Sequence, residues 1–297
     1  MKSTKAFGRH YFSPTGFPIT VKSVPAGSGP QHPYDLTETL HYHDFAELII
    51  ITAGNGIHVI NDVEYPVTAG DVFLIQGFSE HHFKSRQSLS HVNVMYDSAR
   101  LPLSVDWLRK IPGYNVIFEL EPNWREHRNF KHRLHLSPAR LAHAETIIQS
   151  MLEETRENAP GYEAVLFSML LELIVYISRQ YDHEASPKTV ALVRIGNVIS
   201  KLEQEHSRAW KLPEIAKLAG MSASNLLILF KMATGVSPID YVIKIRLRRA
   251  ATDLCSSANS ISEIAFEHGF RDSNYFSKKF KQVYDMSPRK YRQKFRT

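Results

Sequence analysis

An internal repeat in the last hundred residues constrains the fold of this chain more than any other feature. The segment PEIAKLAGMSASNLLILFKMATGVSPIDY (213–241) matches SEIAFEHGFRDSNYFSKKFKQVYDMSPRKY (262–291). The offset is 49 residues at the glycines Gly220 and Gly269, and 50 residues at the later Ser-Pro pairs. The second copy therefore has one extra residue, in its turn or at the start of its second helix. Both copies should fold as the same supersecondary unit.

Each copy has the pattern of a helix, a glycine turn and a second helix. Pro213 suits a helix start, and Ser260 with Glu263 forms a capping box. The glycines supply the left-handed conformation that a reversal needs. This is the helix-turn-helix arrangement, whose second helix enters the major groove of DNA. Apolar residues at helical spacing in 240–257 predict one helix that couples the copies, so that they read groove segments about 34 Å apart.

The charge distribution favours a nucleic-acid partner. Residues 188–297 hold 20 Lys+Arg against 9 Asp+Glu, a net charge of +11, which leaves −5 for residues 1–187. A basic module on a mildly acidic body is typical of polyanion binders. A duplicated helical pair can also form a solenoid or a protein-docking module, but the charge and the spacing favour DNA.

The repeat resembles the AraC/XylS family of bacterial transcription regulators over about 100 residues. GFRDSNYFSKKFKQVYDMSPRKYR (269–292) is similar to that family's C-terminal signature, although Arg271 replaces a small residue and leaves Asp272 as the expected helix cap. The resemblance implies two sets of outward, DNA-facing residues: Ser224, Asn225, Leu227 and Ile228 in the first copy, and Ser273, Asn274, Ser277 and Lys278 in the second. Asparagine suits adenine and lysine suits guanine or phosphate, whereas leucine and isoleucine can touch only thymine methyl groups.

The first half of the chain has a different periodicity. Residues 20–97 alternate short β-rich runs with turn signals, at a spacing typical of a sandwich or small barrel. The expected strands are AELIIITAG, GIHVIND, EYPVTAG, DVFLIQG and HVNVMYD. Residues 98–136 carry no clear period and are expected to be irregular. From Ser137 a helical stripe begins, and a second helix is expected from Tyr162 to Tyr181.

The stretch HYHDFAELIIITAG (41–54) carries the candidate ligand-binding residues. It fits H-x-H-x3-E-x6-G, and GDVFLIQGFSEH (70–81) adds a later histidine. His41 and His43 share one face of a strand, and Glu47 joins them if that strand is continuous. His81 must come from a neighbouring strand. The other histidines nearby, His58, His82 and His91, are expected on the surface or in the core.

These two motifs resemble those of cupins over about 60 residues. In metallo-cupins the equivalents of His41, His43, Glu47 and His81 bind a divalent metal, and this donor set suits nickel, iron, manganese or zinc. Sensor domains of AraC-type regulators keep the same pattern around an effector. Three interpretations therefore stand at this point: effector contact, bound metal, or a hydrogen-bonded polar network.

Within the family, HDFAELIIITAGNGIHVIN most resembles the regulators of L-rhamnose operons, which implies a deoxysugar or a related pentose or hexose as effector. The aromatic segment with Phe7, His10, Tyr11, Phe12 and Phe17 is expected either as an arm over the barrel mouth or as a plain strand docked on the sheet.

The predicted architecture is α+β and multidomain. It has a cupin-like β-barrel (1–136), an αα-hairpin for core packing or dimerisation (137–182), a linker (183–190) and an all-α domain with two helix-turn-helix motifs (191–297). The dominant prediction is a DNA-binding transcription regulator, not an enzyme, that responds to a small molecule. A metal-dependent cupin enzyme fused to a DNA-binding domain and a ligand-independent regulator are the alternatives.

The remaining expectations concern location and partners. One cysteine, Cys255, and no secretory h-region predict a cytoplasmic protein, and no apolar stretch approaches the ~20 residues that span a bilayer. No cofactor is expected, apart from a divalent metal under the cupin alternative. The expected partners are promoter DNA, a monosaccharide effector, RNA polymerase and a second copy of the chain.

Overall fold

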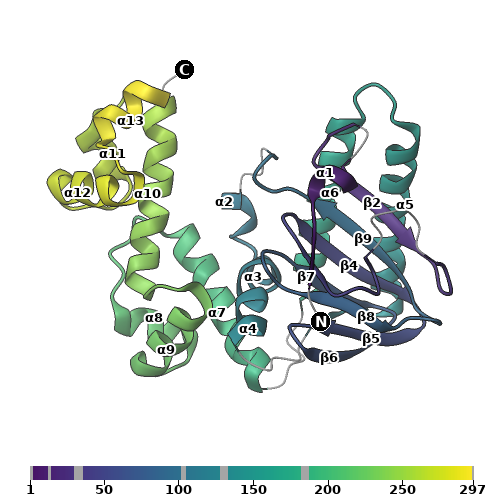
Figure 1. Cartoon of the computed structure of the whole chain (residues 1–297). Coiled ribbons are helices and arrows are strands. Elements are labelled where there is room, and N and C mark those ends of the chain that lie inside the picture. Colours follow the sequence, from purple (N-terminus) through teal and green to yellow (C-terminus); the bar gives the residue numbers. More distant parts are fainter. Residues whose placement is uncertain are drawn as a thin grey trace. The chain divides into compact units, whose positions relative to one another are not determined.

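A computed structural model describes residues 3–12, 15–29, 36–101, 105–127, 133–181 and 187–295. The chain divides into two compact units, residues 1–193 and 194–297. Figure 1 shows a β-rich unit and an all-helical unit, as the sequence predicted. Each unit is described by itself below.

Two five-stranded sheets build the first unit, and all of their strand pairs are antiparallel except β1 with β3. The first sheet has the order β1 (Thr4–Ala6), β3 (His41–His43), β8 (His81–Ser85), β5 (Asn55–Ile60) and β6 (Val63–Thr68). The second has the order β10 (Leu134–His135), β7 (Asp71–Ile75), β4 (Ala46–Ala53), β9 (Ser90–Tyr96) and β2 (Ile19–Val24). The five strands predicted from sequence are confirmed as β4, β5, β6, β7 and β9.

Strand β4 is buried on both faces, which explains its unbroken apolar run. Successive side chains of a strand point to opposite faces. Leu48 and Ile50 belong to the core that the second sheet shares with helices α5 (Pro138–Glu157) and α6 (Tyr162–Arg179). Ile49 and Ile51 belong to the separate core that contains side chains of both sheets. Each of these four side chains has 0% exposure.

The expectation that residues 98–136 are irregular is wrong for much of that segment. It contains α2 (Val105–Leu108), α3 (Pro112–Tyr114), the π-helical turn η1 (Asn115–Leu120) and α4 (Glu121–His127). Tyr114 and Phe118 pack into the core with the second sheet. α3, η1 and α4 follow one another without a break, but the π-helical turn in the middle interrupts the 3.6-residue period that a sequence pattern would show, so tertiary packing decides them.

The αα-hairpin follows the predicted boundaries closely. The apolar stripe of α5 is buried, and Asn158 ends the helix in the left-handed conformation, with φ 49°. Of the segment predicted as a linker (183–190), residues 183–186 lie outside the described part. From Pro187 the chain is helical, since α7 (Pro187–Gln204) begins there.

Within the described residues, the second unit has seven helices, counting α7, which starts just before the boundary of the unit. After α7 come α8 (Leu212–Ala219), α9 (Ala223–Thr234), α10 (Pro238–Ser256), α11 (Ile261–Glu267), α12 (Ser273–Tyr284) and α13 (Pro288–Phe295). In Figure 1, α8 and α9 lie at one end of α10, and α11, α12 and α13 lie at its other end. The helix expected at 240–257 to couple the two copies is therefore confirmed as α10.

The arginines of α10 are largely structural. Arg248 holds both carboxylate oxygens of Glu203, at 2.8 and 2.9 Å, and Arg249 donates to the Glu203 carbonyl at 2.8 Å. Glu203 has 0% exposure, so its ion pairs fix α7 against α10.

No single helix of the described part is long and apolar enough to span a membrane, and only the bent pair α8 and α9 passes that test together.

Candidate functional site

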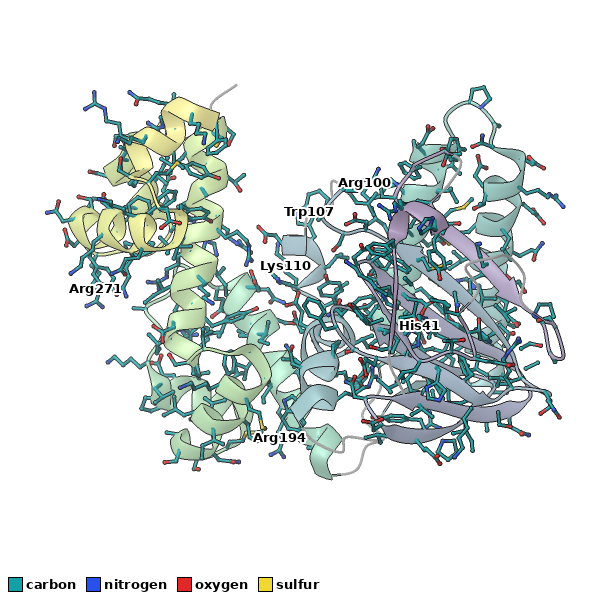
Figure 2. The ribbon with its side chains drawn as sticks, in the orientation of Figure 1. His41, Arg100, Trp107, Lys110, Arg194 and Arg271 are labelled. Atoms are coloured by element: carbon teal, nitrogen blue, oxygen red, sulfur yellow. The ribbon has the colours of Figure 1, made fainter. Side chains whose placement is uncertain are left out.

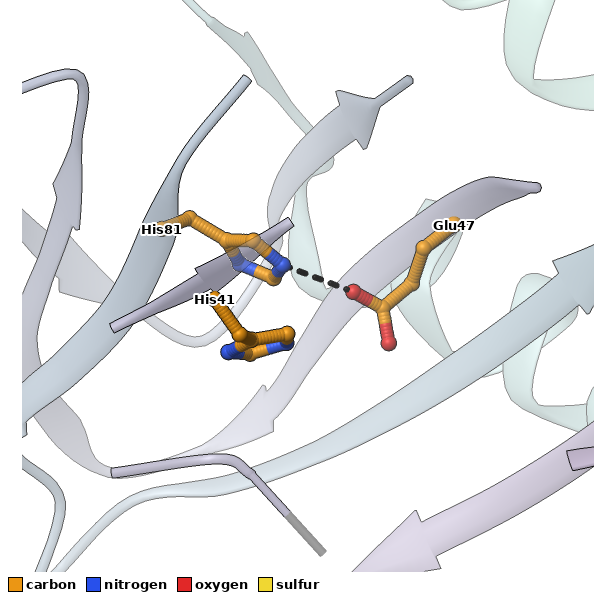
Figure 3. A group of neighbouring side chains, drawn as sticks. All are labelled: His41, Glu47 and His81. Carbon is orange, nitrogen blue, oxygen red and sulfur yellow. Dashed lines mark ion pairs between the residues drawn. The ribbon is translucent and has the colours of Figure 1, made fainter. Parts of the chain in front are cut away.

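The predicted ligand residues come together between the two sheets, but not on one strand. The condition that one strand continue from His41 to Glu47 is not met, because the chain leaves β3 after His43 and joins the other sheet as β4 at Ala46. His41 faces its register partner His81 on β8, as the sequence required of a neighbouring strand. Glu47 approaches both from the opposite sheet. Figure 3 shows the three side chains converging.

One carboxylate oxygen is shared by two imidazoles. Glu47 Oε2 lies 3.4 Å from Nε2 of His43 and 3.4 Å from Nε2 of His81. Nδ1 of His43 lies 2.7 Å from the Phe45 carbonyl, and a carbonyl only accepts, so Nδ1 carries the proton. If Nε2 carries no proton, it turns a lone pair toward the carboxylate, and two acceptors that face each other need a donor or a cation between them.

Burial keeps this cluster in a defined charge state. Burial lowers the pKa of His41, and it lowers the pKa of His81 well below 6.5 with help from the neighbouring histidines, so both rings are neutral near pH 7. Burial alone would raise the pKa of Glu47. The nearby imidazole of His43, followed by the other surrounding imidazoles, outweighs that effect, and the pKa of Glu47 falls below its ordinary value. The site therefore holds the Glu47 carboxylate beside the neutral rings of His41 and His81.

The cluster opens into a cavity of about 340 Å³. Its polar wall includes Lys22, Thr37, His41, Glu47, His81 and Asn93, and its apolar wall includes Val24, Ile49, Phe83 and Met95. Tyr11 from α1 (Gly8–Tyr11) also lines it. Strand β1 ends at Ala6, before the aromatic segment, so that segment is not the plain strand of one expectation; its helical turn α1 instead reaches the cavity through Tyr11.

His43 faces a different cavity. That cavity, of about 650 Å³, is lined also by Tyr42, Asp44 and Gln76. The structure therefore brings all four predicted residues together, but only His41, Glu47 and His81 line the first cavity.

Sequence reasoning missed two polar partners of the cluster. His58 Nε2 lies 3.2 Å from His81 Nδ1, and the His58 ring is fully buried. Asn93 lines the cavity, with a buried Oδ1 for which no hydrogen bond is found within the described part. The signal was present, because His58 and Asn93 fall on the inward positions of β5 and β9 by simple alternation.

Three of these residues also fit a metal. Ligand atoms of His41, Glu47 and His81 all lie within 4.8 Å of one another. Nδ1 of His41 is held by the Thr39 carbonyl at 2.7 Å, and Nδ1 of His81 by His58. In both rings Nε2 is therefore the nitrogen left to coordinate an ion. Two oriented imidazoles and a carboxylate are a donor set for iron, zinc or manganese.

The second candidate site lies on helices α9 and α12. Ser222 caps α9 by accepting from the Asn225 amide at 3.3 Å. Asp272 caps α12, as predicted, by accepting from the amides of Asn274 at 3.0 Å and Tyr275 at 2.9 Å. The cap Ser222 lies two positions after Gly220, whereas the equivalent cap Asp272 lies three positions after Gly269. The extra residue of the second copy is therefore in the turn.

The predicted DNA-facing positions lie on the outer sides of these helices. Leu226 and Phe230 in α9, like Phe276 and Phe280 in α12, have 0% exposure. Of the eight predicted positions, Ser273 and Ser277 are half-buried and the other six are exposed. When the two helices are aligned on their caps, Ser224 is equivalent to Asn274, and Asn225 is equivalent to Tyr275. The alignment from sequence had instead paired Asn225 with Asn274, one position away.

Comparisons with known proteins cover both units. Residues 29–169 match the model of the AraC-like ligand binding domain, and residues 215–294 match a helix-turn-helix domain. The HTH-type transcriptional activator RhaR of Escherichia coli (strain K12) is 31% identical over 253 residues, which are 85% of this chain and 86% of RhaR. RhaR of Yersinia pestis bv. Antiqua (strain Angola) is 32% identical over 256 residues, which are 86% of this chain and 84% of RhaR.

Proposed function

Since the chain belongs to the AraC family of DNA-binding transcription regulators, we propose that it is controlled by a neutral monosaccharide bound in the 340 Å³ cavity. Glu47 carries this proposal. Its Oε2 is buried, has no hydrogen bond within the described part, and faces the unpaired Nε2 atoms of His43 and His81. Sugar hydroxyls supply the donors that such acceptors require, and leaving them unmet is costly.

The remaining walls suit a sugar ring. Asn93 can donate and accept, and Tyr11 adds a phenolic hydroxyl. Phe83, Ile49 and Met95 offer apolar surface to the C–H face of the ring. The cavity volume falls within the range of roughly 300–1,000 Å³ for small-molecule sites. The resemblance of residues 43–61 to regulators of L-rhamnose operons makes L-rhamnose the first sugar to try.

The helical unit is proposed to bind promoter DNA through α9 and α12. Asn274 and Lys278 present an amide and an ammonium to base edges or phosphates, and Leu227 and Ile228 present apolar surface to thymine methyl groups. Like the relatives named as transcriptional activators, the protein would act in the cytoplasm as an activator. It would work as a homodimer, and RNA polymerase would be its downstream partner.

A metal at His41, Glu47 and His81 is the second candidate, favoured by the convergence of their ligand atoms. When bound, a divalent ion would place positive charge between the carboxylate and the two rings. His58 and the Thr39 carbonyl would orient those rings. This candidate makes the site a metal-dependent sensor, or the active site of an enzyme fused to the DNA-binding unit.

One experiment separates these proposals. Purified protein is melted with a panel of monosaccharides that includes L-rhamnose, before and after chelation, while its metal content is measured. A sugar at 100 times its Kd should stabilise the fold by about 2.7 kcal/mol. A sugar-specific shift that survives chelation supports the effector cavity. About one metal ion per chain without any sugar shift supports the second candidate. If the protein shows no sugar shift and holds no metal ion, the remaining alternative is a ligand-independent regulator.

A further inference from the structure

A notch in the helical unit carries a group of cations that the recognition helices do not include. It is a hollow of about 480 Å³ between the two helix-turn-helix lobes, with a floor on α10. Its cations are Lys211, Arg246 and Arg271. Its apolar surface comes from Trp210, Ile239, Ile243 and Tyr275, which are half-buried or exposed.

Among the described residues, no carboxylate forms an ion pair with Arg246 or Arg271 in the notch. Arg246 donates to the carbonyls of His206, Arg208 and Gly269 at 2.7–2.8 Å, so its charge meets no carboxylate there. Arg246 and Arg271 line the same notch, and burial, followed by the charge of Arg271, lowers the pKa of Arg246. Asp272 is the acidic residue among those that line the notch, and its carboxylate already accepts hydrogen bonds from the amides at the start of α12.

Arg271 differs from Arg246 in its contacts. Its side chain is exposed, and no hydrogen bond or ion pair of its guanidinium is found within the described residues. Figure 2 shows it in the turn that precedes α12, at the side of that helix turned toward α8 and α9. Arg246, in contrast, is fixed by its three carbonyls and ties the Gly269 turn to α10.

The geometry of B-form DNA gives this notch an occupant. Two recognition helices on one face of a duplex read successive major-groove segments, so the minor groove between them faces the protein. Minor-groove walls are apolar deoxyribose edges, and a narrow, A·T-rich minor groove concentrates negative potential that attracts arginine. A cationic notch with apolar walls is complementary to that surface.

We propose that Arg271 enters the minor groove between the two major-groove segments and makes the protein prefer A·T pairs there. The inference rests on the proposed DNA binding by α9 and α12. Tyr275 and Ile239 would pack against the sugar edges, and Lys211 and Arg246 would hold the flanking phosphates. The preference would arise at base pairs that neither recognition helix touches.

Selection from a library of random duplexes tests the idea with the full-length protein. The wild type should enrich two sequence boxes about one helical turn apart, with A·T pairs between them. Arg271→Ala should keep the boxes and lose the A·T preference. Arg271→Lys keeps the charge without the planar fork, and it should also lose the preference. Arg289→Ala, which removes an exposed charge from α13, is the matched control and should behave as the wild type.

A defined duplex then identifies the groove. Replacing the central A·T pairs by G·C should weaken wild-type binding about tenfold. Inosine·cytosine pairs, which lack the minor-groove amino group of guanine, should restore it. Enriched boxes with the same central preference in wild type and Arg271→Ala would overturn this inference alone. A uniform loss of affinity without base preference would make Arg271 a phosphate contact. No enrichment by the wild type would refute the proposed DNA binding itself.

Discussion

His58 Nε2 lies 3.2 Å from Nδ1 of His81, although His58 itself does not line the cavity that His81 faces. The two residues sit on neighbouring strands of one sheet, and the His58 ring also stacks on Phe83 at 4.5 Å. The contact fixes which nitrogen His81 turns toward Glu47. His58 is therefore a positioning residue for the cavity.

Replacing His58 should weaken effector binding without removing a cavity side chain. In His58→Phe the stack on Phe83 can persist, but Nδ1 of His81 loses its partner. We expect a loss of about tenfold in sugar affinity, and a loss of about 1–3 kcal/mol in the free energy of unfolding. Calorimetric titration and urea unfolding measure the two effects. His82→Phe, at the adjacent position of β8, is the control, and equal losses in both variants would contradict the positioning role.

Glu47 should matter more to binding than to folding. Glu47→Gln keeps the shape of the side chain but replaces a charged acceptor by an amide that both donates and accepts. Affinity for the sugar found in the melting panel should fall by tenfold or more, because hydrogen bonds to charged groups contribute about 1.5–3 kcal/mol. The measurement is the Kd by calorimetry. An unchanged Kd with an intact fold would remove the carboxylate from the effector site.

The buried histidines should make stability depend on pH. Burial holds the pKa of His58 and His81 well below 6.5, while in the unfolded chain both rings titrate near that value. The unfolded state therefore gains protons as pH falls below about 6.5, and the folded state does not. The free energy of unfolding should drop with falling pH by up to about 1.4 kcal/mol per unit for each such ring. Urea unfolding at pH 7.5 and 5.5 measures the slope. It should be shallower in His58→Phe, and a flat profile would show that these rings charge inside the fold.

On α12, Asn274 is expected to select a base. Its exposed amide can pair bidentately with adenine, so Asn274→Ala should relax the preference at one position of the operator by about 1–3 kcal/mol. Competition assays with single-base operator variants measure this. Gln282→Ala, exposed near the other end of the same helix, should leave every preference intact. The same selectivity in Asn274→Ala and the wild type would remove Asn274 from the recognition face.

Lys278 is expected to contribute mainly charge. If it meets a phosphate, Lys278→Ala should lower affinity evenly across sequences and reduce the salt slope of log K by about one. Operator affinity measured at several salt concentrations gives the slope, with Arg289→Ala as a charge-matched control. A changed base preference at a constant slope would instead indicate contact with guanine.

The helical unit could be predicted almost completely from the sequence. Its repeat fixed two helix-turn-helix copies, and their caps at Ser260 and Asp272 are local hydrogen bonds between residues two or three apart. The strands of the first unit could be located for the same reason, because alternation and turns are local signals. Segment 98–136 could not, since its short helices are held by packing against the core.

The sequence by itself indicated the candidate residues, which are the histidines and Glu47 of 41–54, His81, and the polar positions of α12. Only the tertiary structure decided how they meet. The break after His43 sends Glu47 to the opposite sheet, the β3–β8 register places His41 beside His81, and His58 joins from a third strand. The notch around Arg271 likewise exists only once α10 holds the two lobes together. Local periodicity is written in neighbouring residues, whereas these sites form from segments that folding alone brings into contact.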